Sequence, residues 1–217
     1  MDRFVYSNYD LGNSPAKYVK ELIKYLRKIK VKSILDYCCG NGRNALYLSK
    51  EGFDLTCIDH SPIISNLKEL ITEKKLPIKI EELTNGKISL PFPKESFDAV
   101  LAWRVLHRGL AIQRKAELEE LKRVIKNQGY LILAVSSEED IEKDAQRRPH
   151  KEVEERTFSY ISKGVKNIRR YFTKEEIESG LAFPGFKIIS LDKIQEATGH
   201  KEQSHLRNYW RIIARKE

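Results

Sequence analysis

A turn bracketed by two glycines, placed between an apolar strand and a helix, constrains this chain more than any other stretch. Residues 32–37 predict a short buried strand that ends in Asp-Tyr. Gly40 and Gly42 then bracket the turn, and residues 43–50 predict a helix. Glycine lets the backbone approach a ligand closely, and the free amides at a helix start favour polar or anionic groups. The stretch therefore predicts a nucleotide-binding element.

The glycine spacing alone leaves two kinds of nucleotide site open. Gly40, Gly42 and Ala45 also fit a dinucleotide fingerprint. Asp59 follows the first glycine by about 20 residues, as that fingerprint requires. Asp36 separates the two interpretations, because a carboxylate at the strand end would repel a pyrophosphate. A ligand with an ammonium group would be attracted instead, and Asp59 could hold its ribose through the hydroxyls.

Three segments resemble the motifs of class I S-adenosylmethionine (SAM)-dependent methyltransferases. Residues 36–42 (Asp-Tyr-Cys-Cys-Gly-Asn-Gly) are similar to motif I, with Cys38 at a position where the family more often has glycine. Residues 58–61 resemble motif II, and residues 97–107 resemble motif IV of the small-molecule branch. The resemblance spans about residues 17–215 and implies SAM as the cofactor. It implies no particular methyl acceptor.

The resemblance also implies which residues contact SAM. An acidic residue near the third strand would contact the adenine amino group; Glu82 is our choice, and Asn85 stays open as an alternative. The ring of Trp103 would cover the methionine portion or, with equal weight, pack in the core. The predicted cofactor-binding residues are Asp36, Cys38, Gly40, Asn41, Gly42, Asp59, His60, Ser61, Glu82 and Trp103.

The predicted acceptor site lies at the carboxyl end of the strand over residues 97–103. His107 follows one helical turn after Trp103, and histidine titrates near neutrality, so we predict a catalytic or substrate-contact role. The alternative is a structural role for His107, in core packing or in capping a helix. Residues 1–13 form either a flap over the SAM cleft or an arm packed by its aromatic residues. The predicted substrate-binding residues are Tyr6, Tyr9, Arg104, His107 and His205.

Alternating strand and helix patterns predict a single α/β domain over residues 1–217. We expect a Rossmann-like, mostly parallel seven-stranded sheet with helices on both faces and an antiparallel C-terminal hairpin. Residues 1–30 would form an N-terminal arm and a helix that Ser14 and Pro15 start. Residues 137–170 lose periodicity and predict an irregular insertion that covers the substrate. The predicted strands are 32–37, 53–58, 78–80, 97–103, 130–135, 186–191 and 206–214, and a long helix is predicted over 109–126.

Composition narrows the classes of partner and compartment. The net charge of +9 suits RNA or an anionic substrate, although a lysine-rich surface is the favoured explanation. Three cysteines, at positions 38, 39 and 57, form no Cys-x-x-Cys pair, so we expect no metal site and a reduced, cytoplasmic setting. The chain has neither an apolar run of about 20 residues nor a secretion signal, so we expect no membrane association.

Taken together, these patterns predict a SAM-dependent methyltransferase that acts on a small molecule by in-line displacement. An RNA methyltransferase that completes a tRNA hypermodification is the alternative among enzymes, and a non-catalytic SAM-binding regulatory protein is the alternative from another class. Amino-methyltransferases of nucleic-acid bases usually carry an Asn/Asp-Pro-Pro-aromatic tetrad at motif IV. In this chain residues 102–105 (Ala-Trp-Arg-Val) stand at the similar position. Amino-group methylation of bases is therefore disfavoured.

Overall fold

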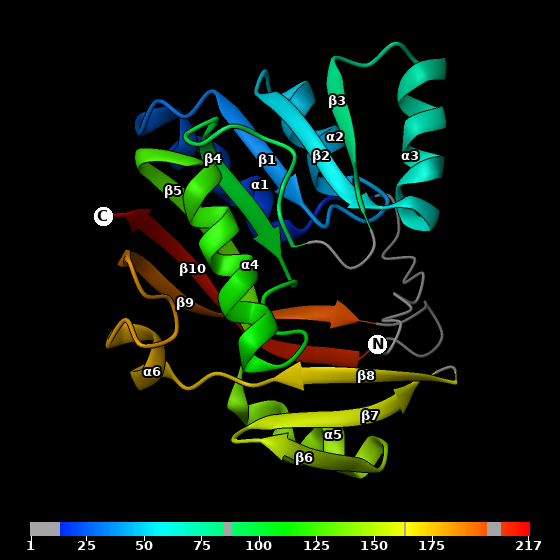
Figure 1. The fold of residues 1–217 in the computed structure, drawn as a ribbon, viewed down its shortest axis with the longest axis vertical. Coiled ribbons are helices and arrows are strands. Elements are labelled where there is room, and N and C mark those ends of the chain that lie inside the picture. The colour runs from blue at the N-terminus through cyan, green and yellow to red at the C-terminus, as the bar shows by residue number, and fades with distance from the viewer. Residues whose placement is uncertain (1–13, 85–87, 163, 199–204) are drawn as a thin grey trace.

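The computed structural model describes residues 14–84, 88–162, 164–198 and 205–217. Its main sheet has seven strands in the order β3-β2-β1-β4-β5-β10-β9 (Figure 1). Strands β1 to β5 are parallel to one another, whereas β10 is antiparallel to both β5 and β9. The predicted fold class is confirmed. The strands are β1 Ser33–Tyr37, β2 Asp54–His60, β3 Ile78–Leu83, β4 Phe97–Trp103, β5 Ile125–Ser136, β9 Phe186–Thr198 and β10 His205–Lys216.

Helices cover both faces of this sheet and bury one apolar cluster on each. Helices α1 (Lys17–Lys28), α2 (Arg43–Lys50) and α3 (Ser61–Glu73) contribute to one cluster. Helices α4 (Ala111–Val124) and α6 (Lys174–Glu178) contribute to the other. The central strands are buried on both sides, so their side chains are apolar almost without interruption. The polar residues that do occur at their carboxyl ends are therefore the candidates for a site.

The start of α1 differs from the sequence-based expectation. Ser14 was expected to cap the helix, but α1 begins at Lys17 and has no side-chain cap of its own. The amide of Ala16 instead donates to Oδ1 of Asn44, which lies on α2, at 3.0 Å. A free amide at a helix start needs an acceptor, and here a neighbouring helix supplies it.

The segment 137–170 also differs from the expectation of an irregular insertion. It folds into a short 3-10 helix (Glu138–Asp140), α5 (Ile141–Arg147) and a separate three-stranded antiparallel sheet in the order β6-β7-β8. The aromatic Phe158 orders it, because its ring packs 4.5 Å from His150 and 5.8 Å from Tyr171. The strands are β6 His150–Glu154, β7 Thr157–Ser162 and β8 Val165–Arg170.

Several strands are longer than their apolar runs predicted. β5 begins at Ile125 rather than at 130, and the predicted helix before it ends at Val124 rather than at 126. β9 and β10 pair over their whole lengths, from Phe186 with Lys216 to Thr198 with His205. Pairing with a partner strand extends these elements through polar positions, which local hydrophobicity does not predict.

Candidate active site

The loop between β1 and α2 holds three residues with left-handed backbone conformations. The φ angles are 53° at Cys38, 61° at Gly40 and 74° at Gly42. An L side chain in this region is strained, which explains why glycine suits the position of Cys38 better in the similar motif. A Cβ added to Gly42 would lie 2.6 Å from the side chain of Leu67 on α3. Gly42 therefore packs α2 against α3 and fixes the loop.

The space beside Gly40 and Asp36 fits the cofactor that motif I implies. A Cβ added to Gly40 would meet no atom within 4 Å among the described residues, so this backbone is open to a ligand. Asp36 is 2% exposed, and its Oδ2 has no hydrogen-bond partner in the described part of the chain. Burial, and then the nearby charge of Asp59, raise the pKa of Asp36 to about 7. A cationic ligand would supply the positive counter-charge that favours the ionised form of Asp36.

Asp59, at the end of β2, ties the loop to its neighbouring strand. Its Oδ2 accepts a hydrogen bond from the Gly40 amide at 2.8 Å, and its Oδ1 accepts one from the His60 amide at 2.7 Å. Burial raises the pKa of Asp59, and these two backbone amides oppose that effect. Each carboxylate oxygen has a second lone pair, so Asp59 retains capacity for two ribose hydroxyls.

The remaining predicted cofactor residues lie at the same edge of the sheet. His60 precedes the first residue of α3, Ser61, and Asn41 lies at the turn, where its Oδ1 accepts from the Arg43 amide at 3.4 Å. Glu82 pairs in register with Asp59 and is exposed on β3. The alternative adenine contact, Asn85, lies outside the described residues.

Trp103 ends β4 with its ring in the core rather than open to a ligand. It is 7% exposed within the apolar cluster, and its Nε1 donates to Oε2 of Glu196 on β9 at 3.1 Å. The next residue, Arg104, has a φ of 65° and lies 3.7 Å from the same carboxylate oxygen. Its guanidinium also lies 5.1 Å from the ring centre of Tyr209. Of the two interpretations of the Trp103 ring, the structure places it in core packing.

His107 is buried at the end of the β4 segment. It is 2% exposed, its ring lies 6.1 Å from that of Tyr209, and its Nδ1 has no hydrogen-bond partner among the described residues. Burial, followed by the positive charges of Arg169, Arg108 and other arginines, holds the pKa of His107 well below its usual range. The imidazole is therefore neutral at physiological pH and is able to accept a hydrogen bond.

Of the remaining predicted substrate residues, His205 lies in the described part of the chain. Tyr6 and Tyr9 lie outside the described residues. His205 begins β10, and its Nε2 accepts a hydrogen bond from Nε of Arg207 at 3.1 Å. Arg207 in turn binds both carboxylate oxygens of Asp144 on α5. His205 therefore belongs to the network that attaches α5 to β10.

Sequence reasoning missed three charged residues that surround this site. Arg43, the first residue of α2, lies within the electrostatic influence of Asp36, Glu196 and Arg104, and burial lowers its pKa. Glu196 and Arg169 come from β9 and β8. No local motif marks any of these positions, because strand pairing and the packing of the small sheet bring them to the site.

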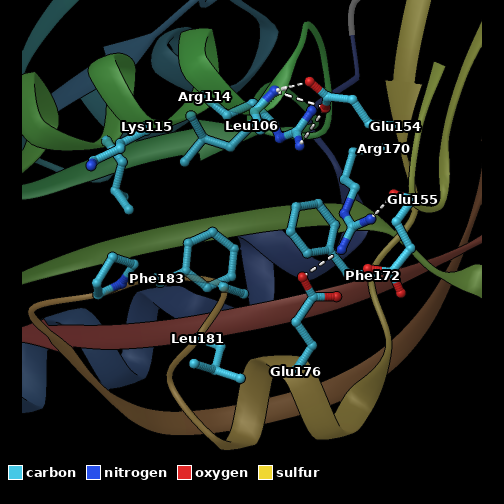
Figure 2. A pocket seen from close by; sticks show the side chains of 14 residues that line it. Leu106, Arg114, Lys115, Glu154, Glu155, Arg170, Phe172, Glu176, Leu181 and Phe183 are labelled. Carbon is cyan, nitrogen blue, oxygen red and sulfur yellow. Dashed lines mark hydrogen bonds and ion pairs between the residues drawn. The ribbon is translucent and has the colours of Figure 1, made fainter.

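A cavity of about 560 Å³ lies apart from the glycine loop, between α4, α6 and the small sheet (Figure 2). Phe172, Leu181 and Phe183 line one part of it. Its charged residues are paired, since Arg114 approaches Glu154 at 3.6 Å and the Arg170 guanidinium binds Glu176 (Figure 2). None of the predicted cofactor or acceptor residues lines this cavity.

Two features are absent from the described ranges. No group of three or more His, Cys, Asp or Glu side chains there is arranged to hold a metal ion. In the same ranges no helix combines the length and the apolar character that a membrane span requires.

A parallel sheet in this strand order, with a glycine loop after β1 and a carboxylate after β2, defines the class I methyltransferase fold. Residues 35–133, which contain all three motifs, match the methyltransferase domain family. Among solved structures, a SAM-dependent methyltransferase from Methanosarcina mazei has a TM-score of 0.68 at 23% identity, over 86% of this chain and 92% of that one. A protein from Pyrococcus horikoshii has a TM-score of 0.72 at 17% identity, over 98% and 97% of the two chains.

One curated relative adds a functional name. A tRNA (carboxymethyluridine(34)-5-O)-methyltransferase from Arabidopsis thaliana is 32% identical over 103 residues, which is 47% of this chain and 23% of the relative. The matched segments cover between 22% and 51% of the lengths of three curated relatives, so the chain spans about half of them or less. The resemblance to class I SAM-dependent methyltransferases is confirmed, and with it SAM as the cofactor of this fold.

Proposed function

We propose that the protein transfers a methyl group from SAM to a small-molecule acceptor by in-line displacement. The observation that carries this proposal is the enclosure of the β4 end beside the glycine loop. The amide of Arg170 donates to the carbonyl of His107 at 2.7 Å, and the amide of Gly109 donates to that of Ile168 at 3.4 Å. Strand β8 thus pairs with residues 107–109 beside the buried His107, and a small acceptor suits a site with so little exposed surface.

The cofactor would lie against the open backbone of Gly40, with its ribose at Asp59 and its cationic groups toward Asp36. Arg43 lies near both this end and the acceptor end, because Asp36 and Tyr209 both interact electrostatically with its guanidinium. Placing donor and acceptor in line supplies on the order of 7–11 kcal/mol of barrier reduction. This arrangement needs no metal ion.

His107 would contact the acceptor through its neutral ring. A general base contributes roughly 100-fold to 10,000-fold, and only where the acceptor carries a proton that must leave. Because its pKa is held low, the imidazole is a weak base and a good hydrogen-bond acceptor. We therefore assign His107 to orienting the acceptor, with proton removal restricted to acidic acceptors.

Methylation of a modified tRNA nucleotide is the second candidate. The net charge of +9 and the name of the relative from Arabidopsis thaliana favour it. An RNA acceptor would have to extrude its nucleotide into the enclosed site, at a cost of a few kcal/mol. It would also give a steep salt dependence of affinity, because phosphate contacts release counterions.

Calorimetric titration with SAM, and with NAD as the control, tests the cofactor assignment directly. Micromolar affinity for SAM and no heat with NAD support the proposal, and the reverse result contradicts it. Transfer of tritium from labelled SAM to a small-molecule pool or to total tRNA then separates the two acceptor classes. Tight SAM binding without transfer to either pool would favour the regulatory alternative.

A further inference from the structure

Arg169 on β8 lies beside His107 with unused hydrogen-bonding capacity. Its Nε and Nη1 atoms are shielded from solvent and have no hydrogen-bond partner among the described residues. Its backbone forms an isolated bridge with Arg108, directly after His107. Buried polar atoms in proteins are nearly always paired, so two unpaired guanidinium nitrogens require an explanation.

The carboxylates near Arg169 are already engaged by other cations. Asp144 is bound by both terminal nitrogens of Arg207 and by the hydroxyl of Tyr171, and these contacts lower its pKa against the effect of burial. Glu196 lies 3.7 Å from Arg104 and accepts the indole N–H of Trp103. In the part of the chain that the structure describes, Arg169 has no carboxylate within ion-pair distance.

Two of the arginines around His107, Arg108 and Arg169, form no ion pair among the described residues, although Glu117 acts on Arg108 and Asp144 acts on Arg169 at longer range. Four arginines, at positions 104, 108, 169 and 207, all act on the pKa of His107 in the same direction. The two nearby carboxylates form ion pairs with only two of them. Tyr160 adds an aromatic wall, with its ring 4.0 Å from Arg148 and 6.0 Å from Arg169. Burial disfavours the charge of Arg169, but the oxygens of Tyr160, Tyr209 and Tyr171 and the Asp144 carboxylate raise its pKa, so Arg169 stays charged and can bind an anionic ligand.

We propose that the methyl acceptor is an anion, and that Arg169 binds its carboxylate or phosphate group beside His107. The inference rests on the proposed function, because it takes the end of β4 as the acceptor site. Arginine suits this task, since its guanidinium stays charged and donates several hydrogen bonds to such groups. The net charge of +9 would speed the encounter with an anionic acceptor.

Binding of a probe anion tests the proposal without knowledge of the acceptor. The full-length protein, saturated with S-adenosylhomocysteine, is titrated calorimetrically with benzoate, with inorganic phosphate and with neutral benzamide at 150 mM salt. Arg169→Gln removes the charge while keeping a polar side chain. Lys166→Gln removes a charge from an exposed residue of the same strand and is the matched control.

The proposal predicts that benzoate or phosphate binds the wild type and that benzamide does not. Arg169→Gln should weaken that binding by about tenfold or more, Lys166→Gln should leave it unchanged, and Arg169→Lys should restore part of it. Preference for benzoate would assign a carboxylate, and preference for phosphate a phosphoryl group. Equal binding of benzoate and benzamide, or equal effects of the two glutamine variants, would overturn the proposal.

A structural role for Arg169 would give a different result. If Arg169 only supported the fold, Arg169→Gln would lower the melting temperature and Arg169→Lys would not restore anion binding. We expect a melting temperature close to that of the wild type, because the Nε and Nη1 atoms of Arg169 have no hydrogen-bond partner to lose among the described residues. Anion binding to protein that fails to bind SAM would leave Arg169 as an anion site, but the proposed function would fail and the anion would no longer be a methyl acceptor. SAM binding without any anion binding would support the proposed cofactor and would overturn this inference.

Discussion

The cofactor end and the acceptor end of this molecule are built in different ways. At the cofactor end, Asp36, the glycine loop and Asp59 lie within a single strand–helix–strand unit, and the bond from Gly40 to Asp59 joins residues 19 apart. At the acceptor end, Arg207 binds Asp144 across 63 residues, and Trp103 binds Glu196 across 93. The cofactor end is thus local in sequence, whereas the acceptor end is assembled by the fold.

This difference has a physical consequence for how each end responds to change. The cofactor loop rests on backbone conformation and on β1 and β2, which the core encloses. The acceptor end rests on the buried ion pair between Asp144 on α5 and Arg207 on β10, and on the backbone bridge between Arg108 and Arg169 on β8. Loss of one partner of a buried ion pair strongly destabilises the fold, because the other charge is left buried without compensation. The two ends should therefore be separable by substitution.

The largest effect is expected from Asp144→Ala. The substitution leaves Arg207 buried without its partner and should reduce the free energy of unfolding by about 3–5 kcal/mol. SAM affinity should stay unchanged, because Asp144 lies outside the cofactor unit. Urea denaturation and SAM titration of the same protein measure both quantities. Glu142→Ala, at an exposed position of α5, is the control, and a parallel loss of SAM affinity would show that the two ends are coupled.

Asp59→Ala should have the next largest effect, this time on the cofactor. It removes the predicted ribose partner and leaves the Gly40 amide unpaired, so SAM affinity should fall by more than about tenfold. Calorimetric titration measures the change. Asp54→Ala, at the exposed start of the same strand, controls for the loss of a charge. Unchanged affinity in Asp59→Ala would remove Asp59 from the cofactor site.

His107→Gln tests the acceptor end with a milder change. The glutamine keeps hydrogen-bonding capacity but not the ring, so turnover should fall by about tenfold while SAM affinity changes little. Initial rates with the acceptor that the tritium assay identifies, together with SAM titration, give the two numbers. His150→Gln on β6 is the matched control. Equal losses of turnover and SAM affinity would place His107 in cofactor binding or packing.

The smallest effect is a pH dependence of SAM affinity that Asp36 controls. With its pKa raised to about 7, the Asp36 carboxyl is mostly protonated below that pH and mostly ionised above it. The ionised form attracts the cationic cofactor, so affinity should rise by roughly three- to tenfold between pH 5.5 and 7.5. Titrations across this range measure the slope. Asp36→Asn should abolish the slope, and a slope that persists in that variant would point to another group.

The sequence predicted the mostly parallel sheet, the class of cofactor and the glycine loop between β1 and α2. Strand β4 was predicted at the bounds that the structure has, because every position from Phe97 to Trp103 except Asp98 is apolar and buried. Cys38 was predicted as a departure from glycine, and its φ of 53° shows the cost of that departure. The sequence failed at α1, where Asn44 on another helix supplies the cap.

What the sequence determined by itself is what depends on neighbours along the chain: the apolar strand, the glycine turn, the helix that follows it and the carboxylates at two strand ends. Only the tertiary structure decided that most of residues 148–170 form a sheet, that β8 of this sheet pairs beside His107 and that Arg169 lies there without an ion pair among the described residues. The physical reason is that turn geometry and hydrophobic periodicity act over a few residues. Burial and charge balance depend on which distant segments meet.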